Sequence, residues 1–267
     1  MSKLALSAVI APVALSLMAA CTEHDSRTVD APEQAIATEG VSDRLGLMTT
    51  LPILWSEGDD FTALLAPDAQ AHWALDALGQ NHEVAAIDIL TPDALAGLEL
   101  LVLAQPRMLS PEENVALDDW VRGGGHALVF ADPMLTGHSE YGVGDKRRPQ
   151  DVALLDTLLA RWGLALEAAP PSAETRFVAF GGGELPLAAH GELTRREPAG
   201  GAQSDCTDRL GRVLTMCAIG KGRAVILADA AILEAEEAPD AAVLVAFEEL
   251  IGMAKEGPAA ASGKSGE

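Results

Sequence analysis

The sequence predicts an α/β protein with an open, mostly parallel sheet, flanking helices and an antiparallel β extension in its C-terminal part. Two observations carry this prediction. Between about residue 44 and residue 168, apolar runs of strand length alternate with amphipathic helical patterns, and strands joined by such helices normally lie parallel. Beyond that point the strand-like runs are short and are separated by Gly-rich turns, which indicates hairpins.

Four elements are expected before residue 110. They are a strand, a helix and two further strands, in the ranges 44–55, 67–80, 82–90 and 98–106. The helix has apolar residues at roughly helical spacing, and Gly79 can end it. The run LELLVLAQP at 98–106 is apolar enough to be buried on both faces, as the strands of a parallel sheet are.

The segment 110–125 is the clearest helix in the chain. Ser110 can cap its first turn, Pro111 suits the first helical position, and Glu113 completes a capping box. An apolar face runs along the segment, and three consecutive glycines end it. The next strand, HALVFAD at 126–132, follows directly.

The remaining elements complete one domain that we expect to span residues 44–256. A helix at 151–163 should turn five apolar residues inward: Leu154, Leu155, Leu158, Leu159 and Trp162. The strand LALEAA follows it, the turn 220–222 lies between two β-like runs as in a hairpin, and a final helix spans about 239–254. This order of elements indicates a flavodoxin-like sheet. The tail 257–267 is of low complexity, and we expect it to be disordered.

The N-terminus has the layout of a secretory signal. Lys3 precedes an apolar run that ends in small residues before Cys21, and Pro12 interrupts what would be a short membrane-spanning helix. We therefore expect a signal peptide at 1–20. The ending MAAC resembles a bacterial lipobox, which implies cleavage before Cys21 and a lipid on its thiol. The alternative is an ordinary signal peptide with an incidental cysteine.

Lipidation would anchor the protein at the periplasmic face of the inner or the outer membrane. Residues 21–43 would then be the lipidated cysteine and a flexible tether, since the segment is polar, acidic and without periodicity. Thr22, directly after the cysteine, resembles the outer-membrane sorting pattern of many Gram-negative lipoproteins. The sequence leaves open which membrane carries the protein.

The charge and the cysteines narrow the class of protein. With 40 acidic against 18 basic residues and a net charge of −22, the surface does not suit a phosphate backbone, so nucleic acid is not an expected partner. In an exported protein the pair Cys206 and Cys217 is most simply a disulfide. No metal or cofactor is expected, because two thiols without a nearby histidine are too few for zinc. Neither Gly-Gly-Gly run continues into a phosphate-binding loop.

Candidate ligand-binding residues follow from the rule that open parallel sheets bind ligands beyond the carboxyl ends of their strands. Acidic residues recur in the segments after the predicted strands: Glu57, Asp59, Asp60, Asp132, Asp145 and Asp229. They either hold a ligand in a polar cleft or cap loops and helices. Trp55, in the exit loop of the first strand, is either a stacking surface for a ligand or a lid over the core.

Three consecutive cations, Lys-Arg-Arg, interrupt this acidic chain just before the helix predicted at 151–163. Cations are unfavourable near a helix N-terminus, so a negative group should lie beside Arg147 and Arg148. That group is either a bound anion or a carboxylate of the protein, because arginine pairs with carboxylates in a bidentate clasp. The internal candidates are Asp145, Asp132 and Glu57.

The segment GHSEYG nearly matches the nucleophile elbow Gly-x-Ser-x-Gly around Ser139. Tyr141 stands where the second glycine belongs, and the strained turn of a true elbow leaves no room for a side chain there. No strand immediately precedes the segment either. We therefore assign no catalytic residue from the sequence.

The stretch LELLVLAQPRMLSPEENVALDDWVRGGGHALVFADP, together with its surroundings at 44–165, is similar to the class I glutamine-amidotransferase-like domain. It looks especially like the branch found in gliding-motility proteins and uncharacterised ABC-transport auxiliary proteins. Amidotransferases of this fold need a cysteine at the tight turn after a strand. Here Ala131–Pro133 occupies that turn, and no cysteine lies between Cys21 and Cys206, so the resemblance implies the scaffold without the activity.

The sequence therefore predicts a lipid-anchored periplasmic binding or accessory protein without amidotransferase activity. The resemblance implies a link to an ABC-type transport system, and the expected partners are the membrane, through the lipid at Cys21, and an envelope protein. The alternative is an envelope hydrolase that uses strand-end carboxylates such as Asp132. A third interpretation is a purely structural envelope protein.

Overall fold

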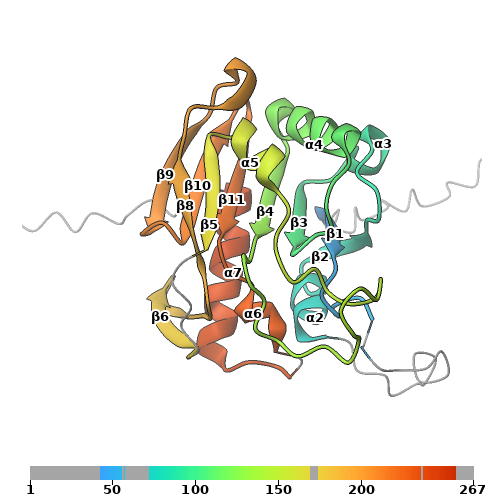
Figure 1. The fold of residues 1–267 in the computed structure, drawn as a ribbon, viewed down its shortest axis with the longest axis vertical. Coiled ribbons are helices and arrows are strands. Elements are labelled where there is room, and N and C mark those ends of the chain that lie inside the picture. The colour runs from blue at the N-terminus through green and yellow to red at the C-terminus, as the bar shows by residue number, and fades with distance from the viewer. Residues whose placement is uncertain (1–42, 56, 58–71, 169–173, 236, 257–267) are drawn as a thin grey trace, which may run out of the picture. The chain divides into compact units, whose positions relative to one another are not determined.

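The computed structural model describes residues 43–55, 57, 72–168, 174–235 and 237–256 (Figure 1). The predicted signal peptide, Cys21, the tether and the C-terminal tail lie outside these residues, as do the candidates Asp59 and Asp60. The described residues form a mixed α/β fold, which confirms the predicted fold class. No helix in this part of the chain is long and apolar enough to cross a bilayer.

A seven-stranded sheet forms the centre of the fold, in the order β2-β1-β3-β4-β11-β10-β9. Five strands run parallel: β1 (Asp43–Thr49), β2 (His82–Ala86), β3 (Leu100–Ala104), β4 (His126–Phe130) and β11 (Gly222–Leu227). At one edge two further strands pair antiparallel, in orange in Figure 1: β10 (Leu214–Ile219) and β9 (Asp205–Leu210). The mostly parallel sheet and its antiparallel extension are both confirmed.

Helices cover both faces of this sheet. One face carries α3 (Pro92–Leu95), α4 (Pro111–Gly123) and α5 (Asp156–Arg161), and the other carries α2 (Trp73–Gly79), α6 (Ala231–Glu234) and α7 (Ala241–Glu256). Successive residues of a strand point to opposite faces. In β4, Leu128 and Phe130 therefore lie in the core with α7, and Val129 lies in the core with α4. Burial on both faces explains why these strands are almost continuously apolar.

The ends of α4 follow from its sequence. The Ser110 hydroxyl accepts a hydrogen bond from the Glu113 N–H at 3.2 Å, and the Glu113 carboxylate accepts one from the Ser110 N–H at 2.9 Å, which confirms the capping box. After the helix, a Cβ added to Gly125 would lie 2.4 Å from the ring of Trp120. Glycine is therefore required where the chain turns past Trp120 into β4.

The chain between α5 and β9 forms two separate two-stranded antiparallel sheets. β5 (Leu164–Ala168) pairs with β8 (Gly191–Arg195), β6 (Arg176–Phe180) pairs with β7 (Gly183–Leu187), and a short 3-10 turn, η1 (Ala199–Gly201), precedes β9. The expectation that every strand of the alternating region lies parallel is thus wrong for β5. The fifth parallel strand is β11, which is buried on both faces as this position requires, whereas β5 exposes Glu167 and Ala168.

The helix predicted at 151–163 is shorter than expected, since α5 begins at Asp156. The residues before it belong to the loop after β4, where the Ala153 N–H donates to the Asp132 carbonyl at 2.8 Å. This bond ties the chain to the sheet edge before the helix can start. Leu154, which was expected to face inward, is 41% exposed as a result.

The predicted disulfide is confirmed. Cys206 of β9 and Cys217 of β10 lie directly opposite each other in the register of the two strands, and their sulfurs are bonded. The bond fastens the edge strand β9 to its neighbour β10 and so secures the antiparallel extension of the sheet.

Candidate functional site

Buried polar side chains stand at the carboxyl ends of three parallel strands. Gln105 follows β3, Asp132 follows β4 and Asp229 follows β11, and each of them is 0% exposed. Open α/β sheets bind their ligands at this edge. The hydrogen bonds that the three side chains already make decide whether they can bind a ligand.

Asp132 joins the loop after β4 to the loop after β11. One carboxylate oxygen accepts a hydrogen bond from the Met134 N–H at 2.7 Å, and the other accepts one from the Ala230 N–H at 3.0 Å. Burial raises the pKa of Asp132 to about 6, although the two N–H groups favour the charged form. Both oxygens therefore serve backbone groups inside the protein.

Asp229 has the same kind of role. Its two oxygens accept hydrogen bonds from the Ala231 N–H at 2.7 Å and from the Ala188 N–H at 2.8 Å. Burial raises the pKa of Asp229 to about 8, and the negative charges of Asp132 and Glu234 add to the effect. Three acidic groups thus interact electrostatically at the ends of β4 and β11.

Gln105 directly follows β3, near the point between β1 and β3 where the strand order reverses and where this architecture usually holds its ligand. Its side-chain amide donates to the Asp132 and Gln150 carbonyls at 3.0 and 2.8 Å and accepts from the Asp132 N–H at 2.8 Å. The Thr50 hydroxyl accepts from the Gln150 N–H at 2.9 Å. The loop after β4 is therefore bonded to residues that follow β1 and β3.

The backbone of Gln105 is strained, with a φ of 47° in the left-handed region that favours glycine. Gln105 was not among the candidates predicted from the sequence, although it lies directly after a predicted buried strand. The signal that could have found it is a polar residue placed directly after a wholly apolar strand and before a proline.

Arg107 forms a clasp near the same edge. Its guanidinium makes a bidentate pair with Glu113, at 2.7 and 2.9 Å, and donates to the Asp88 carbonyl at 2.5 Å. The hydrogen bonds from Arg107 hold the pKa of Glu113 down at about 2, and the Ser110 and Leu90 N–H groups act in the same direction. The clasp fixes the start of α4 to the loop after β2.

The loop after β4 contains the basic cluster. Arg147 pairs with Asp145 at 2.8 Å and lies over the Tyr141 ring at 4.2 Å, while Arg148 pairs with Asp151 at 2.8 Å and donates to the Tyr141 carbonyl at 2.7 Å. Both arginines therefore pair with carboxylates of their own loop, as in the clasp alternative. Asp151 is a partner that the sequence analysis did not name.

Glu57 and Ser139 are bound to each other. The Glu57 carboxylate accepts from the Ser139 hydroxyl at 3.0 Å and from the Glu140 N–H at 2.8 Å, so it holds the loop after β4 close to the loop after β1. The Ser139 hydroxyl also accepts from the Tyr141 N–H at 3.2 Å. Trp55 is 38% exposed in the loop after β1.

The predicted candidates thus do not meet in one cleft. Asp132 and Asp229 lie together under the loops at the ends of β4 and β11, whereas Glu57, Asp145, Arg147 and Arg148 belong to the contacts of the loop after β4. Among the described residues there is no group of three His, Cys, Asp or Glu side chains that could hold a metal ion.

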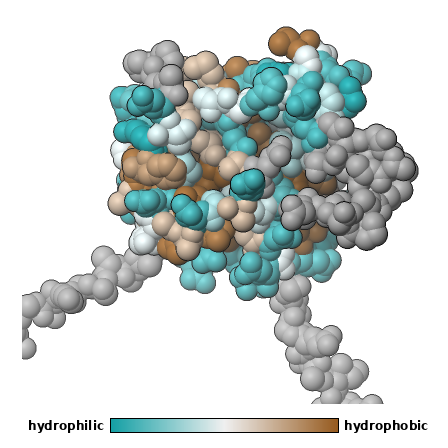
Figure 2. Space-filling view, turned by 90° about the horizontal axis from the view of Figure 1, so that it is seen from below, coloured by the Kyte–Doolittle hydropathy of each residue, from teal (hydrophilic) through white to brown (hydrophobic). Residues whose placement is uncertain are grey.

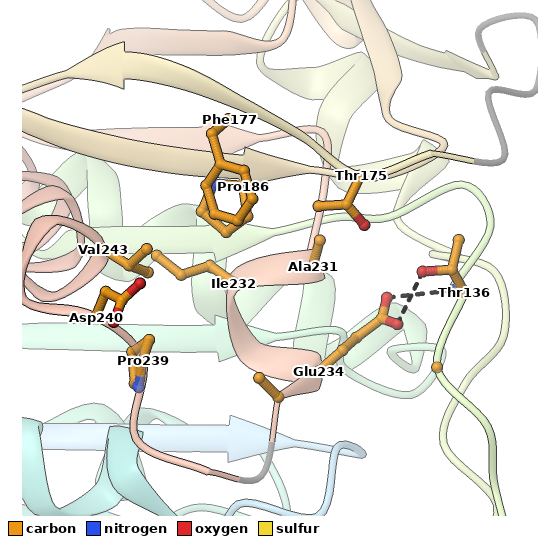
Figure 3. Close-up of a pocket in the computed structure, with 12 residues that line it drawn as sticks. Thr136, Thr175, Phe177, Pro186, Ala231, Ile232, Glu234, Pro239, Asp240 and Val243 are labelled. Atoms are coloured by element: carbon orange, nitrogen blue, oxygen red, sulfur yellow. Dashed lines mark hydrogen bonds between the residues drawn. The ribbon is translucent and has the colours of Figure 1, made fainter.

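A cavity of about 450 Å³ lies beside the buried carboxylates (Figure 3). Its walls come from the loop after β4, the β6–β7 hairpin, α6 and the start of α7. The Glu234 carboxylate, at the rim, accepts hydrogen bonds from the N–H and the hydroxyl of Thr136, at 3.2 and 3.1 Å. Figure 2 shows the molecule from below, with apolar residues (brown) exposed among hydrophilic ones (teal).

The sequence analysis missed this cavity entirely. Its lining residues come from three regions of the chain, at 136–137, 175–186 and 231–243, and none of them carries a local motif. Only the docking of the β6–β7 hairpin beside α6 and α7 creates the space, and a sequence pattern does not report such docking.

Comparison with known proteins shows that the first part of the chain is similar to one family. The profile of a family described as ABC-type uncharacterized transport system matches residues 43–169, a little under half of the chain, from β1 to the end of β5. This similarity supports the transport-auxiliary part of the resemblance seen in the sequence. The amidotransferase-like part of that resemblance stays a prediction. A search of curated proteins finds no match.

Several solved structures are similar to the chain at low identity. The mmIFT52 N-terminal domain is 14% identical, with a TM-score of 0.47 over 81% of this chain and 99% of that domain. A β-galactosidase from Bacillus circulans sp. alkalophilus is 15% identical (TM-score 0.44), and the match covers 79% of this chain and 31% of the enzyme. The exo-β-1,4-mannosidase Op5Man5 from Opitutaceae bacterium strain TAV5 is 13% identical (TM-score 0.41), with 81% and 34% covered.

Proposed function

We propose that the protein is an accessory or binding protein of an ABC-type transport system, anchored by a lipid in the bacterial envelope, and that it catalyses no amidotransfer or hydrolysis. The similarity of residues 43–169 to the transport family supports the class. The observation that carries the non-enzymatic role is the use of Asp132, which stands in the turn where an amidotransferase-like fold would need its nucleophile. Its two oxygens are buried and accept backbone N–H groups.

A hydrolase would need strand-end carboxylates that reach a substrate. A general acid or base must come within about 3 Å of the proton that it transfers, directly or through one water. Asp132 and Asp229 are 0% exposed, and all four of their oxygens accept hydrogen bonds from backbone N–H groups. The geometry therefore favours a structural role for both carboxylates over the hydrolase alternative.

The anchor and the location rest on the N-terminal sequence. The signal-like segment 1–20 precedes Cys21, and a polar tether then leads to the folded residues that begin at Asp43. The disulfide between Cys206 and Cys217 suits an oxidising compartment such as the periplasm. We propose that the folded part faces the periplasm and leave the choice of membrane open.

The change Asp132→Asn tests the non-enzymatic role. Asparagine keeps the size of the side chain but presents an N–H₂ group to one of the two N–H donors, so we expect the free energy of unfolding to fall by about 1–3 kcal/mol. Chromogenic ester, amide and glycoside substrates should show no turnover above buffer with either the parent protein or the variant. Asp119→Asn, at an exposed position further along α4, is the matched control.

Two outcomes would speak against the proposal. Turnover of any of these substrates by the parent protein, lost in Asp132→Asn while the unfolding curve is unchanged, would make Asp132 a catalytic group. Turnover that Asp132→Asn leaves intact would place an active site elsewhere in the chain and would also end the non-enzymatic account.

A further inference from the structure

The cavity beside α6 has a divided lining. One part is apolar and includes Phe177, Pro186, Ile232 and Val243, and the other offers two carboxylates and two threonine hydroxyls. In Figure 3, Phe177 and Pro186 lie above the cavity, with Asp240 at one side and Glu234 at the other. No lysine, arginine or histidine is among the described residues that line it.

The size of the cavity suits a small molecule. Ligand pockets in proteins commonly enclose about 300–1,000 Å³, and this one has about 450 Å³. It also lies at the carboxyl end of β11, on the edge that the architecture uses for ligands. Near the usual place between β1 and β3, Gln105 is bonded to the loop after β4, whereas this cavity is open.

Glu234 is held in place but keeps capacity for a ligand. Each of its oxygens accepts one hydrogen bond from Thr136, whereas a carboxylate offers about four acceptor positions. No described residue forms a salt bridge with Glu234, Asp132 or Asp229. Burial is the main cause that raises the pKa of Asp132 and Asp229, and the negative charge of Glu234 adds to the effect, so a cation at Glu234 would weaken that repulsion.

The apolar wall adds an aromatic face. Phe177 of β6 is 59% exposed and stands directly opposite Pro186 of β7 in the register of the hairpin. An aromatic ring that borders a cavity attracts a positively charged group, with about 0.5–2 kcal/mol of stabilisation. Asp240, at the other side, directly precedes α7, whose N-terminus favours a negative charge there.

We propose that this cavity binds a small organic cation, an ammonium group carried on an apolar body. The ammonium would lie by the Glu234 carboxylate, the apolar body would pack on Phe177, Ile232 and Val243, and Asp240 would add negative charge at the other side of the cavity. A metal ion fits less well, because no three ligating side chains are grouped among the described residues. An anion fits less well still, since the lining supplies carboxylates and the chain carries a net charge of −22.

This proposal goes beyond the transport association and does not depend on it. The ligand is inferred from the chemistry of the lining alone. A failure of the protein to associate with a transporter would leave the cavity proposal standing, and the reverse also holds.

The test compares two probes of the same shape that differ in charge. Choline carries a trimethylammonium group, and 3,3-dimethylbutan-1-ol carries a neutral tert-butyl group of similar size. Titration calorimetry with the purified full chain should show that choline binds at least about tenfold more tightly, a difference of about 1.4 kcal/mol. Glu234→Gln and Asp240→Asn should each weaken choline binding several-fold, and Phe177→Leu should do the same.

Glu248→Gln serves as the matched control, because it removes the same charge from an exposed position of α7 that does not line the cavity. Its affinity for choline should equal that of the parent chain. Equal binding of the neutral probe would overturn the cationic assignment. No binding of choline up to about 100 mM, or equal losses in Glu248→Gln and Glu234→Gln, would overturn the site. Circular dichroism of each variant shows that a loss of binding does not come from unfolding.

Discussion

Asp118 of α4 is a carboxylate with four hydrogen bonds, and its removal gives the sharpest prediction about stability. It is 0% exposed. One oxygen accepts from Arg122 at 3.0 Å and from Arg161 at 2.8 and 2.5 Å, and the other accepts from the Trp162 indole at 3.0 Å. Burial would raise the pKa of Asp118, but these bonds outweigh it and lower the pKa instead. The group therefore joins α4 to α5 as a carboxylate.

The expected magnitude follows from the exposure of the partners. Breaking a buried ion pair by removing one partner costs about 3–5 kcal/mol, because the other charge is left uncompensated. The side chains of Arg122 and Arg161 are 23% and 36% exposed. Water can therefore replace part of the hydrogen bonding that the two arginines lose when Asp118 is removed. We therefore expect Asp118→Ala to lower the free energy of unfolding by about 3 kcal/mol, near the lower end of that range.

The measurement is urea unfolding followed by far-UV circular dichroism. Asp119→Ala is the matched control, since Asp119 is the next residue of the same helix and is exposed. Its free energy of unfolding should change by no more than about 0.5 kcal/mol. A loss below about 1 kcal/mol in Asp118→Ala, or equal losses in the two variants, would refute the argument that this buried network holds α4 to α5.

Three further predictions concern the sheet edge, the turn into β4 and pH. Replacing Cys206 and Cys217 by serine should lower the free energy of unfolding by about 2–4 kcal/mol in urea titrations without reductant. Gly125→Ala should lower the free energy of unfolding by about 1–3 kcal/mol, because its Cβ would lie 2.4 Å from the Trp120 ring. A Cβ at Gly123 meets nothing within 4 Å, so Gly123→Ala should leave the melting temperature unchanged or raise it. Burial raises the pKa of Asp229 from 3.8 to about 8, so the folded state retains a proton that the unfolded chain loses. Stability measured in urea should therefore fall as pH rises through this window.

Each of these has an outcome that would count against it. Unchanged stability of the double serine variant would show that the bond between β9 and β10 adds nothing to the fold. Equal melting temperatures for Gly125→Ala and Gly123→Ala would mean that the chain relaxes around Trp120. If Asp229→Asn has the same pH slope between pH 4 and pH 8 as the parent protein, Asp229 is not the group responsible.

Local signals in the sequence were sufficient for much of the fold. The capping box at Ser110 and Glu113 and the apolar runs of β3 and β4 fix their elements through neighbours in the chain. The disulfide was predicted from the even pair of cysteines together with the expected export of the protein. The parallel position of β11 was missed because the Gly-rich turn at 220–222 indicated a hairpin. That hairpin exists, but its second strand also pairs with β4.

The candidate site was much less predictable. The strand-end rule identified Asp132 and Asp229 as residues at the functional edge, but only the structure shows that their oxygens accept backbone N–H groups. The cavity depends on Phe177 and Glu234 meeting from elements that are remote in the chain. Such contacts are set by the packing of whole elements, which no spacing of residues encodes.

The central claim is the association with an ABC-type transporter, and its most direct measurement is the recovery of transporter subunits with this protein. The full chain, with an affinity tag after Glu267 and with Cys21 intact, would be purified from detergent-solubilised membranes of its own host and its partners identified by mass spectrometry. The account predicts an ATP-binding-cassette subunit and a membrane permease in near-stoichiometric amounts, and recovery of this protein when the permease carries the tag instead. Recovery of the protein alone in both directions, under conditions in which the transporter itself stays assembled, would contradict it.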